Sequence, residues 1–272
     1  MFEQLGSICN LGLRHVRKEN PRFMFWSVYY PFNFGDWIGP YLYIKKTKSE
    51  PWFKSPSSFD RGTVYMTAGS IMGFTRENSI VWGSGIMSRK TLFPRPHSIR
   101  AVRGPYTKEL CDSLGYDCPE VFGDPGLTLP SFYNPDRMNK YKLGIIPHYT
   151  DMDRVAKIFS AEEIVIIDVR YPIDHIIDLM NQCECIVSSS LHGIILSHAY
   201  SIPVGWVSFD SQLTGDGVKF LDHFGSLGEF SPQKLDGAIN IPIDELISFA
   251  QDMKHYDTTE TVAQRLLQAC PF

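Results

Sequence analysis

The chain has 272 residues, of which 43% are hydrophobic and 21% are charged, and its formal net charge at pH 7 is −4. These fractions are close to the averages for globular proteins, which excludes a fibrous or an intrinsically disordered chain. A slightly acidic chain without a block of five Lys or Arg residues is unlike a protein that binds the phosphate backbone of nucleic acids. We therefore expect one large or two small globular domains and no nucleic-acid partner.

The sequence also bears on the cellular compartment. No uninterrupted apolar stretch approaches the roughly 18–20 residues that span a bilayer. Arg14, Arg17 and Lys18 follow a weakly apolar start, which is the reverse of the order in a secretory signal peptide. The six cysteines include no C-x-x-C pair and need neither a disulfide framework nor a zinc site. We expect a cytoplasmic protein with reduced thiols.

Hydrophobic patterning predicts alternating strands and helices in the first half of the chain. The predicted strands lie at residues 22–30, 63–68, 79–82 and 98–102, and the predicted helices lie near residues 38–46 and 105–115. Residues 122–139 are rich in Gly, Pro and Asn and break this pattern. We place a domain boundary there, after residue 138.

The second half alternates more regularly. Strands are predicted at residues 142–146, 163–169, 185–188 and 204–209, and helices at residues 152–159, 172–181, 191–200, 243–253 and 259–268. Strands that are apolar throughout are typical of a parallel sheet covered on both faces. The pattern predicts an α/β protein of two Rossmann-like domains, 1–138 and 139–272, that face each other across a cleft. The helical tail after residue 225 either packs back across the first half or forms an interface.

One segment suits a binding site in such a fold. Ligands of open α/β sheets bind beyond the carboxyl ends of the strands, where helix N-termini offer free N–H groups to anions. The segment 185–193 runs from a buried strand through Ser188, Ser189 and Ser190 into a helix that carries His192 in its first turn. A histidine there can bind a phosphate or carboxylate, or deliver a proton. Helix capping alone can explain the serines, so both interpretations stay open for them.

A set of motifs occurs in the order found in a known family. The motifs are NFGD at 33–36, WGSG at 82–85, IRAVRGPYT at 99–107, FGDPGLTLP at 122–130, GIIPHYTD at 144–151, CIVSSSLHG at 185–193 and VKFLDHF at 218–224. Together they resemble the polysaccharide pyruvyl transferase family. The resemblance implies a glycosyltransferase-B-like fold and transfer of pyruvate from phosphoenolpyruvate to a sugar of a cell-surface polysaccharide precursor, forming a ketal. No cofactor or metal is expected beside this donor.

Two residues are the main catalytic candidates. Arg103 ends a strand just before Gly104 and Pro105, and its guanidinium matches a carboxylate or phosphate of the donor; the alternative is a surface arginine paired with Asp or Glu. His192 matches the family's histidine in S-x-LHG, which the resemblance makes the candidate general acid. Many relatives carry arginine immediately before LHG, where this chain has Ser190. His148 or Lys219 can replace that missing cation.

Other candidates for substrate binding follow strands. Asn33 and Asp36 lie at the first strand-to-loop crossing, where Asp36 either caps the next helix or accepts sugar hydroxyls. Gly83 and Ser84 can cradle an anion, and Ser189 and Ser190 can bind one at the start of their helix. Asp124 is expected to fix a turn, with a position in the cleft as the alternative. The acids of Asp151-Met152-Asp153 are typical of a helix start rather than of a metal site.

The resemblance leaves two other functions open. A nucleotide-sugar-dependent glycosyltransferase can use the same scaffold, because fold does not fix function. A non-catalytic glycan-binding relative is the second alternative, which Ser190 favours. For the pyruvyltransferase we expect a sugar or a lipid-linked oligosaccharide as acceptor, with peripheral contact at the inner face of the membrane.

Overall fold

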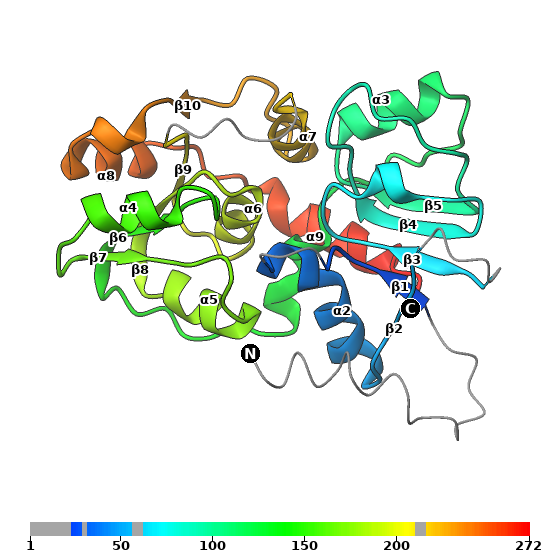
Figure 1. Ribbon diagram of the computed structural model, residues 1–272, viewed down its shortest axis with the longest axis horizontal. Coiled ribbons are helices and arrows are strands. Elements are labelled where there is room, and N and C mark those ends of the chain that lie inside the picture. Colours follow the sequence, from blue (N-terminus) through cyan, green and yellow to red (C-terminus); the bar gives the residue numbers. More distant parts are fainter. Residues whose placement is uncertain (1–22, 29–31, 56–61, 210–215) are drawn as a thin grey trace.

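The computed structural model describes residues 23–28, 32–55, 62–209 and 216–272 of the chain. Within these residues the protein is an α/β structure built on two five-stranded parallel sheets (Figure 1). The first sheet contains β1 (Phe23–Phe25), β2 (Trp52–Phe53), β3 (Val64–Met66), β4 (Ser79–Ser84) and β5 (Ser98–Val102). The second contains β6 (Tyr141–Ile146), β7 (Ile164–Ile166), β8 (Cys183–Ser188), β9 (Val204–Val207) and β10 (Lys234–Leu235).

The two sheets share one topology. The strand orders are β2-β1-β3-β4-β5 and β10-β9-β8-β6-β7, and all neighbouring strands are parallel. Numbered within its own sheet, each order is 2-1-3-4-5, one of the two common orders of doubly wound α/β folds. The predicted α/β class is therefore confirmed. The division at residue 138 and the cleft between two domains stay predictions.

Helices connect and cover these strands. They are α2 (Phe34–Thr47), α3 (Pro105–Ser113), α4 (Met152–Ile158), α5 (Ile173–Met180), α6 (Leu191–Ala199), α7 (Val218–Ser226), α8 (Ile243–Gln251) and α9 (Thr258–Gln268), with short 3₁₀ segments η2 (Met72–Phe74), η3 (Pro125–Ser131) and η4 (Ala238–Asn240). The predicted apolar stripe of α5 is confirmed, because Ile173, Ile176, Ile177 and Met180 are all buried. Within the described residues, no helix is both long and apolar enough to cross a membrane.

Some elements differ from the sequence predictions. The first strand is confined to Phe23–Phe25, while residue 22 and residues 29–31 lie outside the described part. Helix α2 begins four residues earlier than predicted, because the Asn33 side chain accepts the Gly35 N–H at 3.0 Å and caps it. The prediction missed β2 and β10, which are too short to show a period, and α7, whose apolar stripe contains buried polar residues.

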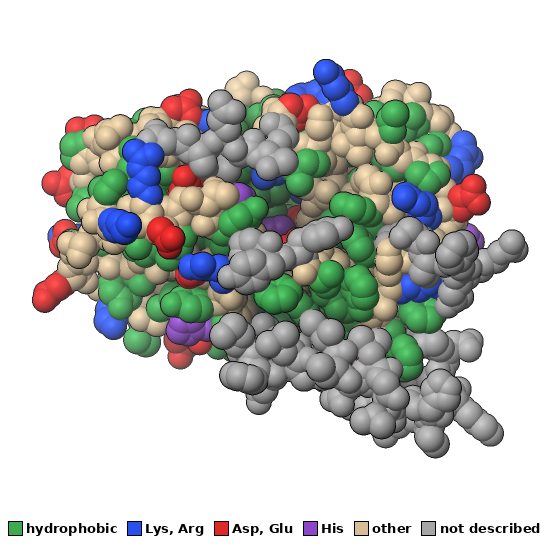
Figure 2. Space-filling model, in the orientation of Figure 1, with side chains coloured by type: hydrophobic (Ala, Val, Ile, Leu, Met, Phe, Trp, Pro, Cys, Tyr) green, Lys and Arg blue, Asp and Glu red, His purple; other side chains and the backbone are tan. Residues whose placement is uncertain are grey.

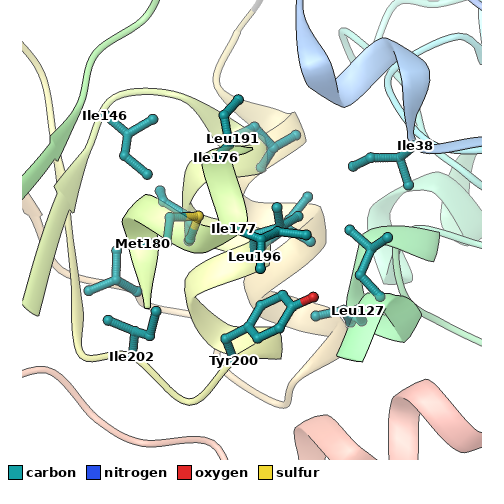
Figure 3. Packing of buried hydrophobic residues seen from close by; sticks show 14 of the residues in the cluster. Ile38, Leu127, Ile146, Ile176, Ile177, Met180, Leu191, Leu196, Tyr200 and Ile202 are labelled. Atoms are coloured by element: carbon teal, nitrogen blue, oxygen red, sulfur yellow. The ribbon is translucent and has the colours of Figure 1, made fainter. Parts of the chain in front are cut away.

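A single hydrophobic cluster joins the two sheets. Figure 3 shows Ile38 of α2 and Leu127 of η3 on one side, and facing them Leu196 of α6 and Tyr200, which follows this helix. Helix α9 adds a second connection, since the Trp82 indole N–H donates to the Leu266 carbonyl at 2.8 Å. The end of the helical tail, α9, therefore packs back onto the first half, one of the two arrangements that we considered, whereas α8 packs on β8 and β9 of the second sheet.

Candidate functional site

The strand order indicates where a ligand would bind. In a sheet of order 2-1-3-4-5, the direction of winding changes between the first and third strands, and ligands bind beyond their carboxyl ends. This switch point lies between β1 and β3 in the first sheet and between β6 and β8 in the second. The segment after β3 includes Gly69, while His148 follows β6 and His192 follows β8.

Asp124 brings these two switch points together. Its Oδ2 accepts the N–H of Gly69 at 3.2 Å and lies 3.6 Å from Nε2 of His192. Its Oδ1 accepts the Gly126 N–H at 2.9 Å and caps η3. Asp124 thus fixes a turn, as we predicted, and it also faces the histidine of α6.

The carboxylate of Asp124 is fully buried and ionised. Burial by itself would raise its pKa, but His192 and the N–H groups of Gly126 and Gly69 outweigh burial and lower the pKa. Nε2 of His192 is buried and makes no hydrogen bond within the described part of the chain. An ionised carboxylate 3.6 Å from Nε2 places negative potential at this side of the imidazole.

The other side of the His192 ring lies against the start of α2. A Cβ atom at position 35 would lie 1.9 Å from Nδ1, so a glycine is required there. The Phe34 ring meets the imidazole edge-on with centroids 6.0 Å apart, and the Phe34 N–H donates to the Val169 carbonyl at 2.8 Å. These contacts place the NFGD segment beside the histidine of the LHG segment.

Asp36 lies in the first turn of α2. Burial raises its pKa from 3.8 to about 6, and the charge of His192 partly offsets this rise. Its side chain is only partly exposed. Asn33 provides the side-chain cap of α2, so the capping role that we considered for Asp36 is not the one seen.

Lys219 is a cation without an acidic partner in the described residues. Burial lowers its pKa to about 8, and the charge of Arg103 adds to this effect. The ammonium lies 5.3 Å from the centroid of the Phe220 ring. The pKa of His148 falls to about 4, through burial and the charge of Lys219, so His148 is neutral at pH 7. Lys219 is therefore charged at pH 7 and His148 is not, and the replacement by Lys219 of the cation missing at Ser190 stays a prediction.

Arg103 lies inside a buried network. Its Nε is 3.2 Å from Oδ2 of Asp222, and its two terminal nitrogens donate to Ser70 Oγ and the Ile86 carbonyl, each at 2.7 Å. Asp222 also accepts the Thr107 N–H at 3.0 Å and the Thr107 hydroxyl at 2.6 Å. Arg103 is thus paired with an acid, but it is not the surface arginine of the alternative, because both side chains of the pair are fully buried. The anion clamp stays a prediction.

The serines after β8 build the local backbone. Ser188 Oγ accepts the Ser190 N–H at 3.0 Å, and Ser189 Oγ accepts the His148 N–H at 2.8 Å. Ser190 is the N-cap residue of α6 but makes no side-chain cap bond. Ser84 donates from Oγ to the Gly69 carbonyl at 3.1 Å, and Gly83 has a φ of 77°. Ligand binding by Gly83, Ser84, Ser189 and Ser190 stays a prediction.

Sequence reasoning missed several buried polar groups nearby. Asp222 and Thr107 are fully buried, and His223 pairs with His198 through ring nitrogens 2.9 Å apart. Burial lowers the pKa of both histidines, and His198 is the core histidine that its apolar position indicates. Figure 2 shows charged side chains over the outer parts of one face and histidine atoms near its middle. Among the described residues, no three His, Cys, Asp or Glu side chains form a metal-binding group.

The comparison with known families decides the classification. The model of the family described as polysaccharide pyruvyl transferase matches residues 74–211, just over half of the chain. The chain belongs to the polysaccharide pyruvyl transferase family. The match includes Arg103, Asp124 and His192. It begins after Asp36 and ends before Lys219, so these two candidates lie outside the matched residues.

Two relatives of this pyruvyl transferase family member are informative. The chain is 33% identical over 174 residues to the uncharacterized protein L143 of Acanthamoeba polyphaga mimivirus, covering 60% of each chain. It is 29% identical over 140 residues to the succinoglycan biosynthesis protein ExoV of Rhizobium meliloti, covering 50% of this chain and 42% of ExoV. The alignments thus cover less than two thirds of both relatives. No solved structure matches the chain significantly.

Proposed function

We propose that this protein transfers pyruvate from phosphoenolpyruvate to a sugar of a cell-surface polysaccharide precursor and forms a ketal. The observation that carries the proposal is the His192–Asp124 pair at the meeting point of the two switch points. A histidine oriented by a buried carboxylate is a suitable general acid. Family membership and the similarity to ExoV support the same reaction class.

The reaction requires a proton donor. Carbon 3 of phosphoenolpyruvate gains a proton, which makes carbon 2 electrophilic, and a sugar hydroxyl then adds to carbon 2. Phosphate leaves, and a second hydroxyl of the sugar closes the ketal ring. We assign the proton donation to His192, whose Nδ1 side faces α2 while Nε2 faces Asp124.

The donor is also an anion. Its phosphate and carboxylate need positive charge, and Lys219 offers an ammonium that no described carboxylate neutralises. Arg103 adds positive potential from within its buried network, since its charge already lowers the pKa of Lys219. We therefore assign donor binding to the α7 side of the site.

The acceptor and location complete the proposal. A sugar or a lipid-linked oligosaccharide would bring its hydroxyl pair to the protonated donor. A lipid-linked acceptor implies a cytoplasmic protein that works at the inner face of the membrane. We propose no metal for the reaction.

Thermal unfolding tests the donor without knowledge of the acceptor. A ligand at 100 times its Kd stabilises the native state by about 2.7 kcal/mol. We expect phosphoenolpyruvate to raise the Tm of the wild type and of His192→Asn, but not that of Lys219→Met. A rise with UDP or GDP alone would favour the glycosyltransferase, and no rise with any of the three would favour the non-catalytic relative.

Turnover then tests the acid. His192→Asn is expected to lower the rate of ketal formation by roughly 10²–10⁴-fold, the usual contribution of a general acid. A wild-type rate in this variant would remove His192 from the role.

A further inference from the structure

The Asp36 carboxylate has no structural task within the described part of the chain. It accepts no hydrogen bond from the described residues, and Asn33 already caps the helix that it lies on. An acid in the first turn of a helix normally has its charge favoured by the helix dipole. The pKa of Asp36 is instead raised to about 6 by burial.

Asp36 lies near the histidine of α6. It follows Gly35, whose backbone lies against Nδ1 of His192, and the imidazole is close enough to lower the pKa of the Asp36 carboxyl, partly offsetting the effect of burial. Asp124 occupies the opposite, Nε2 side of the same ring. His192 therefore has the buried, hydrogen-bonded carboxylate of Asp124 on its Nε2 side and, on its Nδ1 side, the first turn of α2, which carries the partly exposed Asp36.

The proposed reaction needs a second proton-transfer group. The sugar hydroxyl must lose a proton as its oxygen attacks, and His192 cannot accept that proton while it donates its own. Two titratable groups with different environments are the usual solution to this problem.

We propose that Asp36 accepts the proton of the attacking sugar hydroxyl, so that the acceptor binds on the α2 side of His192. This inference rests on the proposed function. In the balanced step, the His192 proton forms the new C–H bond at carbon 3, the hydroxyl oxygen forms the C–O bond at carbon 2, and the hydroxyl proton passes to Asp36. Asp36 then returns the proton to His192. The departing phosphate takes the bonding electrons of its C–O bond and the proton of the second hydroxyl.

The pH dependence of the Tm distinguishes a role of Asp36 in proton transfer from a role in stabilising the fold. A raised carboxyl pKa means that ionisation destabilises the folded state: the penalty is absent below about pH 4, grows up to pH 6 and is complete above it. Asp36→Asn is therefore expected to raise the Tm at pH 8 and to leave it unchanged at pH 4. A lower Tm at pH 8 would show that the carboxylate stabilises the fold, which would overturn the proposal.

Kinetics test the role itself. The full-length wild type, Asp36→Asn and the exposed-site control Asp112→Asn are incubated with phosphoenolpyruvate in D₂O, with water alone or with methyl hexopyranosides that have free O4 and O6. Deuterium incorporation at carbon 3 reports proton donation by His192, and release of pyruvate or formation of ketal reports attack by a hydroxyl. We expect Asp36→Asn to keep the donor-induced rise in Tm and the deuterium exchange. The rate of attack by a hydroxyl, measured as pyruvate release or ketal formation, is expected to fall at least 10-fold.

The outcomes are distinct. Wild-type rates of attack in Asp36→Asn, or a loss of donor binding in this variant, would overturn the assignment of Asp36. A wild type that neither binds the donor nor exchanges deuterium would contradict the proposed function, and this inference with it.

Discussion

His192 of α6 and Asp124 of the segment before η3 face each other at 3.6 Å, although they follow strands of different sheets. Asp124 also holds the Gly69 N–H at the end of β3. One carboxylate thus fixes both the backbone of the first sheet and the histidine of the second. Any change at Asp124 acts on both.

The Asp124→Asn substitution removes the negative charge of the side chain but keeps an oxygen that can cap η3. The Asn oxygen can still accept the Gly126 N–H and cap η3, but the NH2 group that replaces Oδ2 cannot accept the Gly69 N–H and places no negative charge beside His192. We expect ketal formation to fall by roughly 10²-fold while the donor-induced rise in Tm persists. The control Asp124→Ala also removes the cap, which costs about 1 kcal/mol more. An unchanged rate in Asp124→Asn would refute the orienting role.

Gly35→Ala tests the contact between α2 and α6. The new methyl group would lie 1.9 Å from Nδ1 of His192, so the ring or the helix must move. Overpacking of this kind costs about 1–3 kcal/mol, and we expect lower turnover as well. In the control Gly73→Ala, the methyl group would meet the Thr91 methyl at 3.3 Å, away from the site. Equal activities of the two variants would contradict this prediction.

Asp222→Ala breaks a fully buried ion pair. It leaves Arg103 charged and buried, and Thr107 loses two hydrogen bonds. We expect a loss of about 3–5 kcal/mol in the free energy of unfolding, measured by urea denaturation. The matched control is Asp112→Ala, which breaks the exposed pair with Lys108 and costs about 1 kcal/mol or less. A similar small loss in both variants would show that Arg103 is stabilised by other groups.

The affinity for phosphoenolpyruvate should depend on Lys219 ionisation. Burial lowers the pKa of this lysine from 10.5 to about 8, so it is charged at pH 7 and loses its charge as the pH rises through 8. We expect the affinity to be full below pH 7 and to weaken between pH 7 and 9, as measured by calorimetry. Lys219→Met should bind weakly at every pH. An affinity that persists to pH 10 in the wild type would mean that another cation binds the donor.

Leu266→Ala tests the packing of α9 on the first sheet. Leu266 is fully buried and lies against Gly123, so its truncation leaves a cavity. We expect a loss of about 2–5 kcal/mol in the free energy of unfolding. Leu92→Ala, at a position that is 78% exposed, should change it by about 0.5 kcal/mol or less. If both variants unfold alike, α9 does not stabilise the domain.

Much of the fold follows from local pattern. The apolar strands of the second half and the stripe of α5 show their burial directly in the sequence, and the first-turn position of His192 follows from the strand before it. Helix α7 was missed because Asp222 and His223 interrupt its apolar stripe. Their burial depends on partners in α3 and α6, which no local pattern contains.

The site was less predictable than the fold. Strand ends indicated Asp36, Arg103 and His192 as candidates, but the distance between two strand ends of different sheets is not encoded in any period. The expected role of Arg103 in binding an anion stays a prediction, and no local pattern indicates its buried partner Asp222, which lies on a later helix. Asp124 was identified as a turn residue because its second contact, His192, lies on a distant segment.

The bond from Trp82 to Leu266 spans 184 residues of sequence. The ribosome synthesises the five strands of the first sheet long before α9. The indole N–H of Trp82 can therefore bond to the Leu266 carbonyl only after the second sheet has been synthesised. Contacts of such long sequence separation slow folding, because the loop must close before they form. While the second half is being synthesised, the first sheet therefore lacks the hydrogen bond from Trp82 to Leu266.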